Sequence, residues 1–339
     1  MTDFLVLVAN AGDGSISTFR LNDEGLERIA VTEGVTGCST FAVDGDRNLV
    51  YAAVKPDATS EFPGVLTLAL DRETGALTPR SRRDLPGGGM NYLALSHGGT
   101  VLLGASYGGG YGISASVADG VVSEPVSQVE FRNLHSVLPS ADGRFAYFVS
   151  LGDDVIAQYG LGADARLDDL GTVAAPEGSG PRHLVLNAAQ DAVYVLTEFS
   201  GEVLHYSRDT ESGALALEGA ASAVDPSAGL THSRFGADPV AEHLVWGADL
   251  HVGDGVLWAS ERSASTLAPV RVAGDGSVSD ATTFTETEPQ PRGFAVAGPW
   301  LVAAGERSTE VALYAVRGAE LELLQRVETG AGANWVRFV

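Results

Sequence analysis

The feature that most constrains this chain is an internal repeat. Six segments share one pattern: a short apolar strand, a turn rich in Asp and Gly, and a second apolar strand. These segments span residues 39–55, 91–107, 135–151, 182–198, 249–262 and 292–306. Turns such as Asp142-Gly143-Arg144 between two apolar runs are typical of β-hairpins. The chain is therefore expected to be built from repeated hairpins.

Each hairpin is followed by a third strand and a weaker fourth one. The turns that lead into the fourth strands at Asp71 to Leu77 and at Asp209 to Leu215 are near copies of each other. Four strands recurring about every 44 to 52 residues, with one longer interval, is the period of a β-propeller blade. The longer interval holds an insertion at 223–246, which either covers part of the channel or is a plain surface loop. No window has a sustained period of 3.6 residues, so helices should be nearly absent.

The two ends of the chain complete the count. Residues 4–10, 14–20 and 26–31 resemble the second, third and fourth strands of a blade, and the missing first strand lies at 332–338. The sequence therefore predicts an all-β, seven-bladed β-propeller with four antiparallel strands per blade. One domain spans residues 1–339, and the N- and C-terminal strands close the last blade. Closure of this kind removes exposed sheet edges.

Polar residues recur where the two innermost strands of a blade meet. The start of the first strand lies beside the end of the second, so these positions from all blades gather at one mouth of the central channel. The residues expected there are Asn91, His135, Arg182, His183, Glu198, Asp249, His251, Arg262, Arg292 and Glu306. Such a concentration of titratable side chains predicts a binding or catalytic site. For any single residue, the alternative is a structural tie between neighbouring blades.

Charge and cysteine content exclude several classes of function. The formal net charge is −23, which repels nucleic acids and anionic membranes. The single cysteine, Cys38, rules out a disulfide framework and a Cys-based zinc site. Histidines and carboxylates of the mouth could ligate zinc or calcium, but the arginines beside them disfavour a cation, and we expect no metal or other cofactor. The N-terminus has no basic leader and only a short apolar run, which predicts a cytoplasmic protein, and no sequence feature sets the oligomeric state.

Six segments in order resemble the lactonase family of seven-bladed propellers: 134–144, 180–183, 247–251, 260–262, 291–294 and 334–338. That family includes the propeller-type 6-phosphogluconolactonases and the fungal 3-carboxy-cis,cis-muconate lactonizing enzymes. The resemblance implies metal-independent hydrolysis, or reversible closure, of a sugar or carboxylic-acid lactone. It implies catalytic roles for His135, Arg182, Glu198 and Arg262. Two positions depart from the family pattern, because Asn91 and Glu306 stand where relatives often carry His and Gln.

These residue types suit lactone opening. Water must lose a proton as it attacks the ester carbonyl, and a cation must meet the developing oxyanion. Glu198 or His135 could be the base, while Arg182 and Arg262 offer forked donors for an oxyanion, carboxylate or phosphate. The other polar residues of the mouth are then expected to bind an anionic lactone. The alternatives are a lactonizing cycloisomerase of the muconate type and a non-catalytic, ligand-binding propeller.

Overall fold

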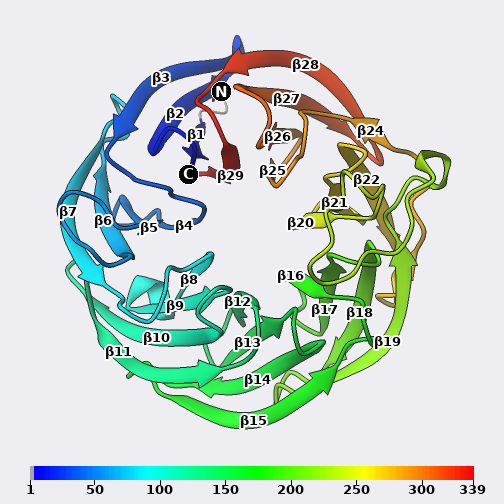
Figure 1. The fold of residues 1–339 in the computed structure, drawn as a ribbon, viewed down its shortest axis with the longest axis horizontal. Helices are drawn as coiled ribbons and strands as arrows, with labels where there is room; N and C mark the ends of the chain where they lie inside the picture. Colours follow the sequence, from blue (N-terminus) through cyan, green and yellow to red (C-terminus); the bar gives the residue numbers. More distant parts are fainter. Residues whose placement is uncertain (1–3) are drawn as a thin grey trace.

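In the computed structural model, which describes residues 4–339, seven antiparallel sheets form a closed ring (Figure 1). We number these blades 1 to 7 and give the strands of each from the channel outward. Blade 1 contains β29 (Ala333–Phe338), β1 (Phe4–Asn10), β2 (Ser15–Asn22) and β3 (Gly25–Glu33). Blade 2 contains β4 (Phe41–Asp44), β5 (Leu49–Val54), β6 (Gly64–Leu70) and β7 (Leu77–Asp84). Blade 3 contains β8 (Tyr92–Ser96), β9 (Val101–Ser106), β10 (Tyr111–Ala118) and β11 (Val121–Glu130).

The remaining blades continue around the ring in chain order. Blade 4 contains β12 (Leu134–Pro139), β13 (Phe145–Ser150), β14 (Val155–Leu161) and β15 (Leu167–Ala174). Blade 5 contains β16 (Pro181–Leu186), β17 (Ala192–Thr197), β18 (Glu202–Arg208) and β19 (Leu215–Ser222). Blade 6 contains β20 (Gly247–Val252), β21 (Val256–Glu261), β22 (Thr266–Val272) and β23 (Val278–Ser279), and β24 (Thr285–Glu286) also pairs with β22. Blade 7 contains β25 (Gly293–Ala297), β26 (Trp300–Ala304), β27 (Glu310–Arg317) and β28 (Glu320–Glu328).

The burial of each strand follows its distance from the channel. Every residue of β5, β9, β13, β17 and β21 is buried, because both faces of these second strands pack against neighbouring blades. The outermost strands, such as β28, alternate between half-buried and exposed residues. This explains why the second strands read as continuous apolar runs while the fourth strands give a weak sequence signal. The core thus lies between adjacent blades, as where Tyr147 and Val149 of blade 4 meet Leu184 of blade 5.

The predicted closure of the ring is confirmed. β29 pairs antiparallel with β1, with Val8 opposite Val336, so the first and last strands of the chain share blade 1. The indole Nε1 of Trp335 donates to the carbonyl oxygen of Phe41 at 2.9 Å, which ties blade 1 to blade 2. The predicted domain of residues 1–339 includes residues 1–3, which lie outside the described part of the chain.

The scarcity of helix is also confirmed. Within residues 4–339 the only helical elements are two 3₁₀ turns, η1 (His97–Gly99) and η2 (Pro226–Ala228). No helix of the described residues is long and apolar enough to cross a membrane. The two near-copy turns adopt the same form, because the side chains of Asp71 and Asp209 each accept hydrogen bonds from backbone amides two and three residues ahead. Each turn then ends on a glycine with positive φ, Gly75 or Gly213.

Candidate active site

The polar site is built at the ends of the innermost strands of blades 4, 5 and 6. In all three blades the pairing of the inner hairpin shifts register at this end: between Leu134 and Ser136, between Pro181 and His183, and between Gly247 and Leu250. A β-bulge places residues outside the regular ladder and redirects their side chains. The residues inside the bulges are His135, Arg182 and the pair Ala248 and Asp249. The three β-bulges lie at the same end of their hairpins and thus direct the functional side chains toward the channel.

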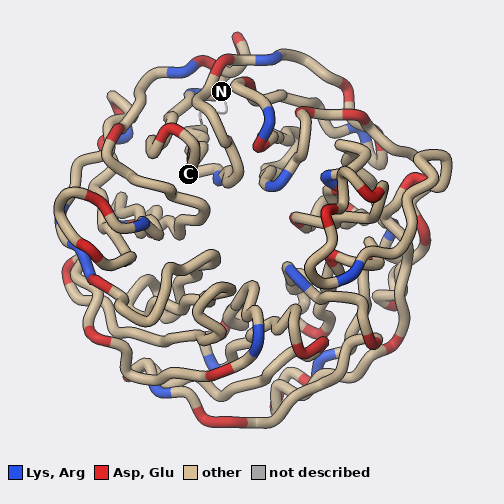
Figure 2. The backbone as a smooth tube through the Cα atoms, viewed as in Figure 1, with Lys and Arg blue, Asp and Glu red and all other residues tan. Residues whose placement is uncertain are grey.

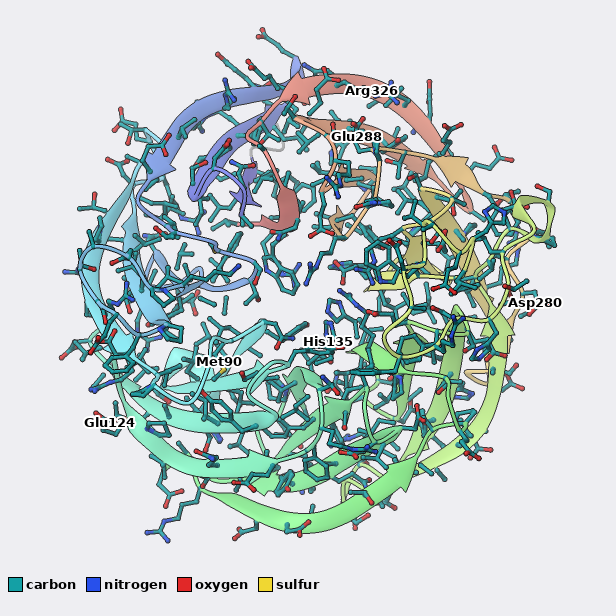
Figure 3. All side chains as sticks on the ribbon, viewed as in Figure 1. Met90, Glu124, His135, Asp280, Glu288 and Arg326 are labelled. Atoms are coloured by element: carbon teal, nitrogen blue, oxygen red, sulfur yellow. The ribbon has the colours of Figure 1, made fainter. Side chains whose placement is uncertain are left out.

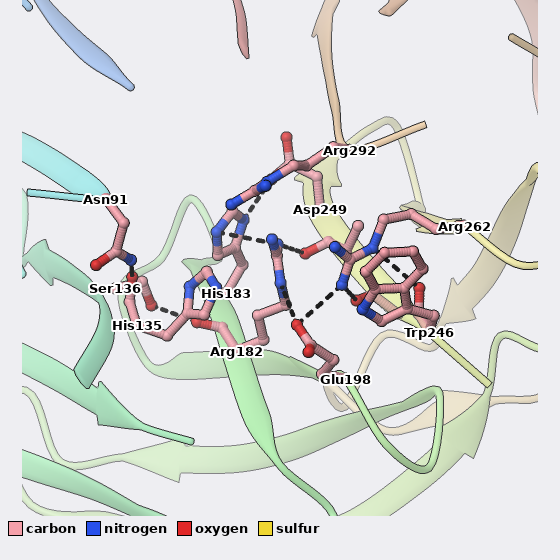
Figure 4. A network of polar contacts seen from close by, with 12 residues as sticks. Asn91, His135, Ser136, Arg182, His183, Glu198, Trp246, Asp249, Arg262 and Arg292 are labelled. Carbon is pink, nitrogen blue, oxygen red and sulfur yellow. Dashed lines mark hydrogen bonds and ion pairs between the residues drawn. The ribbon is translucent and has the colours of Figure 1, made fainter. Parts of the chain in front are cut away.

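The centre of the site is one carboxylate held by two buried arginines (Figure 4). Arg182 Nε and Arg262 Nη2 both donate to Glu198 Oε2, at 2.8 and 2.9 Å. The side chains of Arg182 and Arg262 are 1% and 3% exposed, and that of Glu198 is 15% exposed. Burial alone would raise the pKa of Glu198, but the charges of Arg262, Arg182 and Arg292 outweigh this effect and lower the pKa below its ordinary value. Glu198 is therefore ionised at neutral pH.

The arginines are fixed by further contacts and still have free donors. Arg182 Nη1 donates to the carbonyl oxygen of Ala248, and Arg262 Nη2 donates to that of Gly247 at 3.1 Å. Burial lowers the pKa of Arg262 to about 9, which leaves the guanidinium charged at neutral pH. Among the described residues, Arg182 Nη2, Arg262 Nη1 and Glu198 Oε1 have no hydrogen-bond partner. The site therefore presents two forked cations and one carboxylate oxygen that a ligand can engage.

His135 lies near the centre of the ring, far from rim residues such as Glu124 and Asp280 (Figure 3). Burial, with the charge of Arg182 and the neighbouring His183, lowers the pKa of His135 well below its usual range, so the imidazole is neutral. Its Nδ1 is buried without a hydrogen-bond partner in residues 4–339. The ring packs edge-on against Tyr107 and His183, with centroid distances of 5.7 and 5.1 Å. His135 is thus a neutral hydrogen-bonding group beside the two arginines.

His183, Asp249 and His251 form a hydrogen-bonded chain that leads away from Glu198. A guanidinium can only donate, so Arg182 Nη1 donates to His183 Nε2 (3.2 Å) and His183 Nδ1 must carry the hydrogen that it donates to Asp249 Oδ1 (2.7 Å). The other oxygen, Asp249 Oδ2, accepts from His251 Nε2 at 3.1 Å. Burial and the charge of Arg182 lower the pKa of His183 to about 3, which keeps this ring neutral.

The remaining predicted residues occupy different places around the channel. Arg292 Nη1 donates to Glu306 Oε1 at 2.8 Å, and this pair is partly exposed. The side-chain amide of Asn91 donates to the carbonyl oxygen of His135 and accepts from the backbone amide of Tyr107, so Asn91 ties blade 3 to blade 4. His251 differs from the expectation. It pairs with Trp258 near the hairpin end of β20, and its side chain lines a cavity that opens at the other end of the channel. The inner hairpins of blades 6 and 7 are shorter than those of blades 4 and 5, so counting residues did not align their first strands.

Trp246 is a site residue that sequence reasoning missed. It is the last residue of the insertion at 223–246, and the guanidinium carbon of Arg262 lies 3.7 Å from the centroid of one of its rings. Its carbonyl oxygen accepts from the backbone amide of Arg262 at 3.0 Å. The end of the insertion therefore forms a wall of the site. In the sequence, the only indication of this role is the position of Trp246 directly before the fifth hairpin.

Acidic and basic residues are distributed unevenly over the ring. Figure 2 shows several Lys and Arg positions on the innermost segments, while many Asp and Glu positions lie on outer strands and loops. Within the described part of the chain, no group of three His, Cys, Asp or Glu side chains is arranged to hold a metal ion. Arg182, Arg262 and Arg292 thus bring positive charge close to Glu198, although the chain as a whole has a net charge of −23.

Comparison with known proteins gives one consistent answer. A family model described as "Lactonase, 7-bladed beta-propeller" matches residues 5–338. The 6-phosphogluconolactonase of Pectobacterium carotovorum subsp. carotovorum (strain PC1) is 30% identical over 346 residues, covering 98% of this chain and 97% of the relative. The 6-phosphogluconolactonase of Enterobacter sp. (strain 638) is 30% identical over 341 residues, with the same coverage.

Solved structures agree on the fold. The periplasmic gluconolactonase of Pseudomonas aeruginosa has a TM-score of 0.86 and 22% identity, covering 100% of this chain and 99% of that one. A protein from Lactobacillus plantarum has a TM-score of 0.87 and 19% identity over the whole of both chains. The family model and the curated relatives cover nearly the full chain, so this protein belongs to the lactonase family of seven-bladed β-propellers.

Proposed function

We propose that this protein is a lactonase that hydrolyses an anionic sugar or carboxylic-acid lactone, with 6-phosphogluconolactone as the first candidate, and that it needs no metal. The observation that carries the proposal is the carboxylate of Glu198 between Arg182 and Arg262, with one oxygen and two guanidinium nitrogens left free. The curated relatives at 30% identity are named 6-phosphogluconolactonase, which supports the same reaction class.

In the proposed mechanism, Glu198 activates the attacking water. Its free Oε1 accepts a proton from a water molecule as the water oxygen bonds to the lactone carbonyl carbon. The carbonyl oxygen becomes an oxyanion, which the free nitrogens of Arg182 and Arg262 stabilise. The intermediate then collapses, the ring carbon–oxygen bond breaks, and the proton passes to the departing ring oxygen. The product is a hydroxy acid.

The electrostatics of the site favour an anionic substrate. The arginines keep Glu198 ionised but also make it a weaker base, because they lower its pKa. A bound phosphate or carboxylate would offset part of their positive charge and raise the pKa of Glu198 in the complex. His135 is less suited to accept the proton, since its protonation would add a buried cation beside Arg182. We assign His135, with Arg292, Glu306 and Asn91, to substrate positioning at the mouth.

The test is a pH-indicator assay of purified protein over a lactone panel that includes δ-gluconolactone and its 6-phosphate, with and without EDTA. We expect hydrolysis to continue in the presence of EDTA and to be faster with the phosphorylated lactone than with δ-gluconolactone. Loss of activity with EDTA would overturn metal independence. Inactivity on every lactone would overturn the hydrolase assignment, and cyclisation of a muconate by the same sample would replace it with a cycloisomerase. Cytoplasmic localisation stays a prediction, to be checked by fractionating the host cell.

A further inference from the structure

A second cavity opens into the channel from the face opposite Glu198. Its volume is about 710 Å³, within the roughly 300–1,000 Å³ of small-molecule sites. It is lined by the far halves of the innermost strands of blades 1 to 6, and its apolar residues include Ala94, Leu138 and Leu186. Ser96, Ser140 and Gln190 contribute polar groups. This cavity involves none of the residues that bind Glu198 directly.

Three aromatic rings separate the cavity from the candidate active site. Tyr92, His183 and Trp335 come from three different blades, and their ring centroids lie 5.2 to 5.8 Å apart in edge-to-face contacts. All three side chains are buried. A ligand in the cavity would therefore rest against this aromatic layer and would not reach Glu198.

The cavity also contains a cation, Arg337. Arg337 lines it, and the guanidinium carbon lies 4.0 Å from the centroid of a Trp335 ring. Of the residues that the structure describes, none with a carboxylate forms an ion pair with Arg337. Its Nη1 donates to the carbonyl oxygen of Val336, and its side chain also hydrogen-bonds to Tyr92. A guanidinium that lines a cavity and has no carboxylate partner among the described residues, within a chain of net charge −23, is suited to bind an anion.

Among the described residues that line the cavity, only Asp249 is acidic, and its charge is already engaged. Its Oδ1 accepts from His183 Nδ1 and from the backbone amide of Leu250, and its Oδ2 accepts from His251 Nε2 and more weakly from the amide of Phe294. It is 2% exposed. Arg337 is thus the charged group lining the cavity that is left for a ligand.

From this geometry we propose that the cavity is a second ligand site, which binds a small organic carboxylate through Arg337, with the body of the ligand against Ala94, Leu138 and Leu186. A carboxylate fits better than a phosphate, because a single guanidinium offers few donors for a dianion. The site is independent of the proposed lactonase reaction.

The chain offers two indole reporters that separate the sites. Trp246 packs on Arg262 at the candidate active site, and Trp335 packs on Arg337 in the second cavity. Protein labelled with ¹⁵N-tryptophan has only four indole signals, which Trp→Phe substitutions assign. The probe is benzoate, with neutral benzamide and inorganic phosphate as comparisons. We expect benzoate to shift the Trp335 signal saturably, and both comparison compounds to bind roughly tenfold or more weakly.

Two variants test the residues. Arg337→Met should weaken benzoate binding at Trp335 by roughly tenfold or more, whereas Arg317→Met, an exposed arginine on β27, should leave it unchanged. Val252→Glu adds a negative charge at the exposed rim of the cavity and should also weaken benzoate binding. This variant keeps the test valid if Arg337→Met fails to fold. A shift of Trp246 alone, no saturable shift at millimolar benzoate, equal binding of phosphate, or undiminished binding by folded Arg337→Met or Val252→Glu would each overturn the proposal. A failure of the lactonase assay would leave the Trp335 readout intact.

Discussion

Replacing Glu198 by Gln tests whether the carboxylate of Glu198 is catalytic or only structural. The substitution keeps the shape of the side chain and an oxygen that can accept from Arg182 and Arg262, but it removes the negative charge and the base. Loss of a general base typically lowers kcat by about 10²- to 10⁴-fold, which corresponds to about 2.7–5.5 kcal/mol of transition-state stabilisation. We therefore expect kcat on the best lactone to fall at least about 10²-fold.

Stability should fall as well, because two guanidiniums that are almost fully buried lose their counter-ion. Removing one partner of a buried ion pair costs about 3–5 kcal/mol, and the retained amide oxygen should keep the loss near the lower end of that range. A matched control is Glu288→Gln. Glu288 is another buried glutamate, paired with Arg326 at 2.7 Å but placed away from the channel (Figure 3). It should lose stability with kcat unchanged.

The measurement is kcat per folded molecule together with the urea midpoint, on the same purified samples. If Glu198 is only a tie between blades 5 and 6, its Gln variant will behave like Glu288→Gln, with a lower midpoint and near-full kcat. That result would refute the assignment of Glu198 as the base and would make His135 the next candidate.

Four further outcomes are expected. Arg182→Lys should lower kcat/KM by roughly 10²-fold in steady-state assays, because the single nitrogen of an ammonium cannot reproduce the planar fork whose separate nitrogens reach Glu198 and the Ala248 carbonyl. A wild-type value would mean that a point charge suffices. The folded-state pKa of Glu198 lies below its ordinary value of 4.5, so the stability from its ion pairs is present above that pH and is lost as the pH falls through the folded pKa. Urea midpoints should therefore drop more steeply below about pH 4.5 in the wild type than in Glu198→Gln, and parallel curves would contradict the cause given for the shift. Truncation after Gly330 deletes β29 and exposes the edge of β1, which should cause aggregation or a large fall in Tm, and an unchanged Tm would show that the shared blade is dispensable. Small anions such as phosphate should inhibit competitively through the free donors of Arg182 and Arg262, and the absence of inhibition would count against an anionic substrate.

The sequence alone determined the fold because its signals are local and repeated. Hairpin turns such as Asp142-Gly143-Arg144, mainly apolar second strands and the two matching Asp-to-Leu turns each depend on residues close in the chain. The pattern occurs seven times, and the first strand of one copy lies at the C-terminus. A closed ring allows this strand to pair with the N-terminal strands of the same blade. The same counting placed Arg182 and Glu198 side by side, because they flank one hairpin of known length.

Only the tertiary structure decided how the polar residues divide between the two ends of the channel. The β-bulges at His135, Arg182 and Asp249 lie in the inner hairpins of blades 4, 5 and 6, beside the central channel, and no local sequence pattern predicts them. His183 and Asp249 are buried and hydrogen-bonded to each other, whereas His251 and Arg337 line the second cavity. The pKa shifts of Glu198 and His135 likewise depend on burial and on charges from other blades. Such effects are set by distances between segments far apart in the chain, which a one-dimensional sequence does not contain.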